Sequence, residues 1–115
     1  MLAVQIKSRS WSTSLMRTKA RFVAHVRPST FHPRPDLHLL FVAVDLDFAD
    51  YGPVWLVPSI DFAAGKPPQG RAGFRFVASA AASSEDRWSR FRLERSELPA
   101  RLLDVLNAIT RPDAC

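Results

Sequence analysis

Two polar residues near the start of the chain, Gln5 and Lys7, have the types and the spacing that phosphodiester hydrolysis uses. They alternate with Val4 and Ile6, so a strand would place both polar side chains on one face. The Gln5 amide oxygen and the Ile6 carbonyl would ligate a divalent ion, whose bound water becomes a nucleophile near neutral pH. The Lys7 ammonium would stabilise charge on the phosphate oxygens. The alternative is that both side chains form the solvated face of an edge strand.

The positive charge of the chain is concentrated in its first third. The net charge is +5 over 115 residues, and residues 1–40 hold seven basic residues against one acid, Asp36. Surfaces that face phosphate carry such a charge, although an arginine-rich composition would produce it as well. The predicted DNA contacts are four cationic side chains and one aromatic side chain able to stack on a base: Arg9, Arg17, Lys19, Arg21 and Trp11.

Other residue types with chemical potential lack a supporting pattern. The histidines at positions 25, 32 and 38 are too far apart for a compact metal motif, and the first and last of them fall in predicted strands. The single cysteine, Cys115, excludes a disulfide framework. Trp55 and Trp88 are predicted to be core or interface residues. The sequence has neither a glycine-rich phosphate loop nor a G-x-S-x-G nucleophile motif.

The elements that must position these residues are mainly strands. Period-two alternation and apolar runs predict strands at residues 2–7, 21–26, 37–48, 54–57, 74–78 and 90–93. We expect the first two to form a hairpin, the third to be central, and the last to lie at an edge. Serine-, proline- and glycine-rich segments at 8–14, 28–36 and 63–73 predict loops. One helix is predicted, with Ser96 as its N-cap and an end before Pro112.

These elements predict a single α+β domain spanning residues 1–115. Its core would be a mixed, mostly antiparallel sheet of five or six strands, with the C-terminal helix packed on one face. No apolar run approaches the roughly 20 residues of a membrane-spanning helix, and no signal-peptide pattern is present. We therefore expect a cytoplasmic protein without membrane contact.

Taken in order, several segments resemble small nuclease-like bacterial proteins of the PD-(D/E)XK superfamily. The resemblance is carried by residues 4–8, 21–23, 39–45, 54–59 and 86–88. It is closest to the subset with glutamine in place of the glutamate, as in Mrr-type restriction nucleases. The resemblance implies a restriction-endonuclease-like core acting on DNA, with Gln5 and Lys7 as catalytic residues. Mg²⁺ would be held by Gln5 and the Ile6 carbonyl in a catalytically complete form.

The chain departs from the superfamily pattern at its start. The superfamily site needs an acid, usually an aspartate, on the strand before the Q-x-K strand, and a glutamate on an N-terminal helix often joins it. Nothing precedes Met1, so we expect either a true start upstream or a degenerate relative that kept the sheet for binding or assembly. Without that carboxylate Mg²⁺ loses its main anionic ligand, so cleavage by this chain is expected to be weak or absent. Asp45 or Asp47 is a possible substitute acid.

Two functions from different classes are consistent with these residues. The first is a nuclease-like, DNA-directed domain, and the second is a non-catalytic module for nucleic-acid binding or protein assembly. In either case the sheet face that an N-terminal helix would cover is expected to be exposed and apolar. Such a face favours a homo-oligomer.

Overall fold

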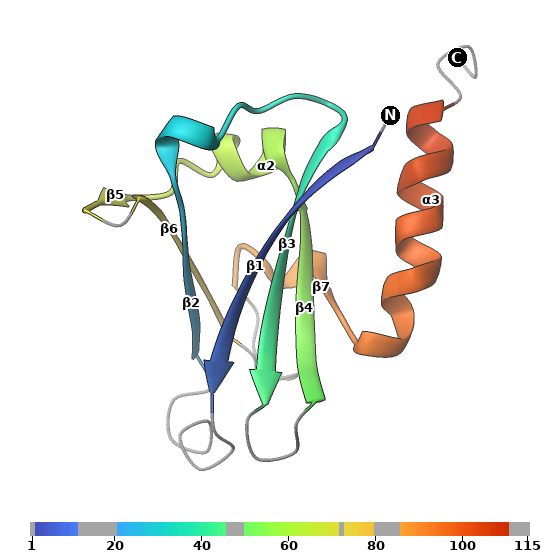
Figure 1. Ribbon diagram of the computed structural model, residues 1–115, viewed down its shortest axis with the longest axis horizontal. Coiled ribbons are helices and arrows are strands. Elements are labelled where there is room, and N and C mark those ends of the chain that lie inside the picture. Colours follow the sequence, from blue (N-terminus) through green and yellow to red (C-terminus); the bar gives the residue numbers. More distant parts are fainter. Residues whose placement is uncertain (1, 12–20, 46–49, 72, 80–85, 111–115) are drawn as a thin grey trace.

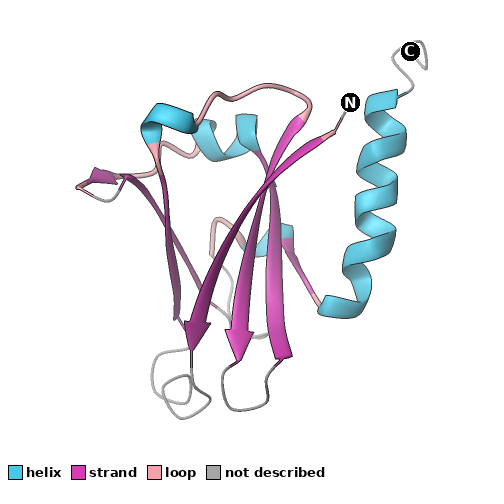
Figure 2. Cartoon of the chain, viewed as in Figure 1, coloured by secondary structure: helices cyan, strands magenta, loops and turns pink. Residues whose placement is uncertain are grey.

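The computed structural model describes residues 2–11, 21–45, 50–71, 73–79 and 86–110. They form a four-stranded sheet with the order β1-β3-β4-β7, a three-stranded sheet with the order β2-β6-β5, and a C-terminal helix (Figures 1 and 2). The strands are β1 (Ala3–Trp11), β2 (Arg21–Val26), β3 (Leu37–Asp45), β4 (Asp50–Pro58), β5 (Gln69–Gly70), β6 (Gly73–Ser79) and β7 (Arg92–Leu93). The helices are α2 (Ser59–Ala64) and α3 (Leu98–Thr110), with 3₁₀ turns η1 (Pro28–Thr30), η2 (Ser89–Phe91) and η3 (Arg95–Glu97). The predicted α+β class is confirmed.

The pairing of the first strand differs from the prediction. β1 pairs with β3 in parallel, from Ala3 opposite Leu37 to Trp11 opposite Asp45, whereas the other ladders are antiparallel. The predicted hairpin of the first two strands is therefore wrong, because β2 pairs with β6 in the other sheet. The strands consequently divide between two sheets instead of forming one. β7 lies at an edge beside β4, as predicted.

Several element boundaries also differ. β1 continues to Trp11 through serines that were predicted to form a loop, since parallel pairing with β3 satisfies their backbone groups. The short helix α2 was not predicted; it follows Pro58 and has only six residues. β5 lies within a predicted loop, where Gly73 adopts a φ of 120°. A side chain at Gly73 would collide with the Val26 carbonyl oxygen, so this hairpin requires glycine.

The two sheets face each other across an aromatic core. Its centre is a stacked pair, Phe41 of β3 and Phe76 of β6, with ring centroids 3.8 Å apart and planes at 3°. Trp55 and Trp88 are both buried in this core, which confirms their predicted packing role. The other buried members are Phe22, Ala24, Val26, Phe31, Leu39, Ala43, Val57, Phe62 and Ala78.

Helix α3 covers the opposite face of the four-stranded sheet (Figure 1). Its Leu98, Leu102 and Val105 pack against a second cluster of buried residues, namely Leu40, Val54, Leu56 and Leu93. The four-stranded sheet is thus covered on both faces, and the expected exposed apolar face is wrong because the second sheet covers it. Homo-oligomerisation stays a prediction.

The start of the last helical segment is set earlier than predicted. Glu94 and Glu97 form a reciprocal capping box around η3, in which each side chain accepts a hydrogen bond from the backbone N–H of the other residue. The predicted N-cap, Ser96, lies inside η3, and α3 begins at Leu98. The capping carboxylate of Glu94 therefore takes the role that the sequence assigned to the serine hydroxyl.

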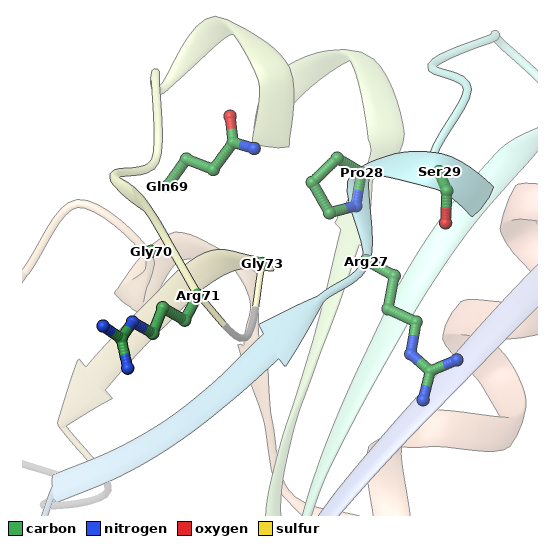
Figure 3. Close-up of a pocket in the computed structure, with 7 residues that line it drawn as sticks. All are labelled: Arg27, Pro28, Ser29, Gln69, Gly70, Arg71 and Gly73. Atoms are coloured by element: carbon green, nitrogen blue, oxygen red, sulfur yellow. The ribbon is translucent and has the colours of Figure 1, made fainter.

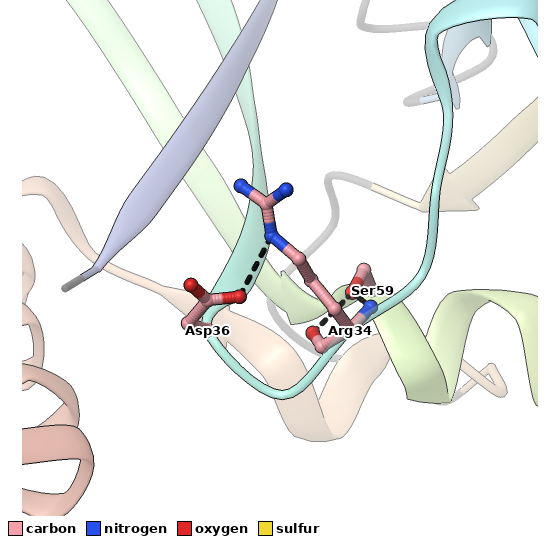
Figure 4. Close-up of polar contacts among 3 residues, drawn as sticks. All are labelled: Arg34, Asp36 and Ser59. Carbon is pink, nitrogen blue, oxygen red and sulfur yellow. Dashed lines mark hydrogen bonds and ion pairs between the residues drawn. The ribbon is translucent and has the colours of Figure 1, made fainter.

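One buried hydroxyl fixes the loop that precedes β3 (Figure 4). The Ser59 Oγ accepts a hydrogen bond from the Arg34 N–H at 2.9 Å and donates one to the Arg34 carbonyl at 2.8 Å. The Arg34 side chain forms an ion pair with Asp36 at 2.7 Å. The carbonyl of Asp36 in turn accepts a hydrogen bond from the Ala3 N–H at 2.8 Å. This chain of contacts ties the start of β1 to helix α2.

Candidate nucleic-acid interface

Three polar residues form a row along one face of β1. Gln5, Lys7 and Arg9 occupy alternate positions and lie opposite three residues of the core, namely Leu39, Phe41 and Ala43. Paired residues of a ladder share a face, so the row faces the side of the sheet that looks toward β2 and β6. The predicted shared face of Gln5 and Lys7 is confirmed.

On the apolar face of β1, burial follows the alternation only at Val4, which packs against the second cluster. Gln5 and Lys7 are half-buried, whereas the Ile6 side chain between them is 63% exposed on the other face. Arg9 is exposed. The lysine stem can lie along apolar neighbours while its ammonium stays at the surface. The row therefore lies on the edge strand of the four-stranded sheet, and β1 there runs beside β2 (Figure 1).

The positive charge of the row is not balanced by a neighbouring carboxylate in the described part of the chain. The ion pairs found there are Arg34–Asp36 and Arg90–Asp61, at 2.7 and 3.5 Å. Neither involves Lys7 or Arg9. A cation without a protein counter-ion remains available for an anionic ligand. The row can therefore contact phosphate oxygens through the ammonium and guanidinium, with the Gln5 amide beside them.

The described residues do not assemble a carboxylate site around this row. Within the segments that the structure describes, no three His, Cys, Asp or Glu side chains come together as metal ligands. Asp45 was a possible substitute acid, but it lies six positions along β3 from Leu39, the residue opposite Gln5. At about 3.3 Å per residue this is roughly 20 Å, so Asp45 and Gln5 do not share an ion and that assignment is wrong. Gln5 and the Ile6 carbonyl would offer only neutral ligands to Mg²⁺.

The histidines occupy separate places. His25 lies in β2 opposite Arg75, and His32 is exposed. His38 lies in β3 and is buried, and this burial lowers the pKa of its imidazole, with the nearby Asp61 carboxylate acting in the opposite direction. The Nδ1 atom of His38 is buried without a hydrogen-bond partner among the described residues.

Several predicted contacts lie partly or wholly outside the described residues. Trp11 ends β1 and Arg21 begins β2, but their side chains are outside the described set. Arg17, Lys19 and Asp47 fall entirely outside it, and so does Cys115. Their predicted roles stay predictions.

The sequence did not indicate a second basic region beside η1. A cleft of about 600 Å³ opens there between the end of β2 and the β5–β6 hairpin, and Arg27 and Arg71 line it (Figure 3). The two guanidinium groups point away from each other in this view. In the sequence, the closely spaced Gly70 and Gly73 indicate the tight hairpin that forms one side of this cleft, beside Val26.

The helices of the described segments include none that is both long and apolar enough to span a membrane. In comparisons with family models, with curated proteins and with solved structures, nothing matches this chain.

Proposed function

We propose that this chain is a nuclease-like, DNA-directed domain that contacts the phosphodiester backbone through Gln5, Lys7 and Arg9. The observation that carries the proposal is the row itself: three alternate positions of one edge strand carry an amide and two cations without a described counter-ion. Cations aligned along a strand can follow successive phosphates of one DNA strand. The Lys7 ammonium is the member placed to stabilise charge on a phosphate under attack.

Hydrolysis is the part of the proposal that needs more than these residues. Mg²⁺ is usually held by one or two carboxylates, and the described residues near Gln5 supply none within ion-pair distance of Lys7. A complete site would use the Gln5 amide and the Ile6 carbonyl together with an added carboxylate. The lack of a carboxylate ligand among the described residues near Gln5 favours the second candidate, a non-catalytic DNA-binding module that uses the same row.

The experiment compares Lys7→Gln with Arg101→Gln, which removes one charge from an exposed position of α3. Binding of a labelled duplex is followed by fluorescence anisotropy between about 50 and 200 mM salt. We expect Lys7→Gln to weaken binding roughly tenfold at the lowest salt and to reduce the salt slope by about 0.9. Arg101→Gln is expected to leave both quantities near their wild-type values.

Cleavage of the same duplex with Mg²⁺ or Mn²⁺ separates the two candidates. Metal-dependent cleavage that disappears in Lys7→Gln supports a nuclease, and Lys7-dependent binding without cleavage supports the module. The proposal fails if the wild-type chain does not bind the duplex at low salt, or if Lys7→Gln and Arg101→Gln bind equally well.

A further inference from the structure

The three-stranded sheet has an outer face that is turned away from the core, and its strands, as the structure describes them, carry no acidic residue; the Asp86 carboxylate accepts a hydrogen bond from the Ser79 N–H at the far end of β6. Alternation along β2 and β6 turns Val23, His25, Arg75 and Val77 outward. Their neighbours point into the core, namely Phe22, Ala24, Val26, Phe76 and Ala78. Helix α3 lies against the other sheet, so it does not cover this face (Figure 1).

Three arginines gather at one end of this face. Arg75 lies on β6, Arg27 directly follows β2, and Arg71 directly follows β5. All three are exposed, and none lies within ion-pair distance of a carboxylate in the described segments. Strands β2, β5 and β6 contain no Asp or Glu. We call these three residues the arginine face.

We propose that the arginine face (Arg27, Arg71 and Arg75) binds the phosphate backbone of double-stranded DNA. It is a second surface, because the row on β1 belongs to the other sheet. The inference shares only its ligand class with the proposed function. Either surface can therefore fail its test while the other passes.

The directions of the side chains indicate a ligand with several separated charges. Arg27 and Arg71 line one cleft but point away from each other, so they do not enclose a single phosphate between them (Figure 3). His25 lies opposite Arg75, and Arg27 follows two positions further along the chain in an extended conformation, just past the end of β2. Such diagonal positions are roughly 7–8 Å apart. A duplex carries one negative charge per about 1.7 Å of its axis, so it offers several phosphates within that distance and can contact both side chains at once.

The residue types on the face favour a duplex over a single strand. Single-stranded nucleic acid is held mainly by aromatic side chains that stack on exposed bases. The outward positions of β2 and β6 described above carry valine, histidine and arginine, whereas Phe22 and Phe76 point into the core. Cations without a stacking platform contact phosphates only. The face therefore supplies backbone contacts independent of base sequence.

The test uses the double variant Arg27→Gln/Arg75→Gln of the full chain, with Arg101→Gln as the exposed control. Anisotropy is measured with a duplex, with a single strand of the same length and with an acidic polyglutamate peptide. We expect the double variant to reduce the salt slope for the duplex by about 2, since each lost phosphate contact reduces it by about 0.9. The duplex is expected to bind more tightly than the single strand or the peptide.

A second measurement locates the contact independently of affinity. Amide NMR shifts on duplex addition are expected to change in β2, β6 and the β5–β6 hairpin, and the spectrum of the free double variant verifies its fold. Unchanged salt slope in the double variant, preferential binding of the peptide, or shifts confined to β1 would overturn the inference. If Lys7→Gln has no effect while the double variant loses binding, the arginine face stands and the row on β1 fails.

Discussion

Replacing Ser59 with alanine removes one oxygen atom and two hydrogen bonds from a fully buried position. The Ser59 Oγ accepts from the N–H of Arg34 and donates to its carbonyl, at 2.9 and 2.8 Å. Ser59 is thus the side chain that bridges both backbone groups of Arg34 in the loop before β3 (Figure 4). Ser59→Ala leaves both backbone groups of Arg34 without this partner, so we expect a clear loss of stability.

The magnitude follows from those two contacts. Each hydrogen bond contributes about 0.5–1.5 kcal/mol to the free energy of unfolding, which brackets the loss at about 1–3 kcal/mol. Arg34 is exposed, so water can replace part of the hydrogen bonding that its backbone N–H and carbonyl lose. We therefore expect the free energy of unfolding to fall by about 2 kcal/mol. For 115 residues the unfolding entropy is about 0.24 kcal/mol per kelvin, so Tm falls by about 8 °C.

Thermal unfolding followed by circular dichroism measures this loss, with Ser29→Ala as the matched control at an exposed serine of η1. Hydrogen exchange adds a local measurement, because the Ala3 N–H donates to the Asp36 carbonyl in the same loop. We expect this amide to exchange faster in Ser59→Ala than in wild type. A Tm within about 2 °C of the control, with unchanged exchange at Ala3, would refute the reasoning.

Two further predictions concern the core and the buried histidine. Phe76→Ala removes the ring that stacks on Phe41 at 3.8 Å. We expect urea unfolding to show that the free energy of unfolding falls by about 3–5 kcal/mol, and a decrease below about 1 kcal/mol would contradict this packing. Burial lowers the pKa of His38 below 6.5, so the unfolded chain binds its proton more readily and stability decreases as pH falls below 6.5. Urea unfolding from pH 7.5 to 5 is expected to show a slope of at most about 1.4 kcal/mol per pH unit that His38→Leu removes; an equal slope in the variant would disprove the assignment.

The sequence predicted the elements of this fold better than their partners. Residues 37–45 are apolar on both faces, and the structure indeed places β3 between two covering layers. Alternation in β1 correctly placed Gln5 and Lys7 on one face. This alternation does not indicate which strand pairs with β1, because any neighbouring strand satisfies the same pattern. The parallel partner comes from a distant segment, which local patterns do not identify.

The burial of Gln5 and Lys7 depends on strand pairings that the sequence did not predict. Val4 and Ile6 suggest an apolar face directed to the core, yet Ile6 is the exposed residue and Lys7 is half-buried. The second sheet lies over the polar side of β1, and that sheet exists because β2 pairs with β6. Helix α2 was missed for a related reason. Six residues are too few for helical periodicity, and Phe62 is held there by tertiary contacts with Phe31 and Trp88.

The parallel register limits where a catalytic acid can come from. Side chains on the row's face of β3 opposite Gln5, Lys7 and Arg9 are Leu39, Phe41 and Ala43, which are apolar and buried. Position 45 lies six residues along β3 from Leu39, the residue opposite Gln5. The described residues of β3 therefore place no acid beside Gln5, and the free position next to β1 is the edge that is not paired with β3. At the C-terminal end of β1 this edge runs beside β2, whereas toward the N-terminus β1 and β2 move apart (Figure 1). A strand added at that edge would lie about 4.8 Å from β1, close enough for its carboxylate and the Gln5 amide to share one ion. Under the proposed function, the acid that hydrolysis needs would therefore have to lie at this edge beside Gln5.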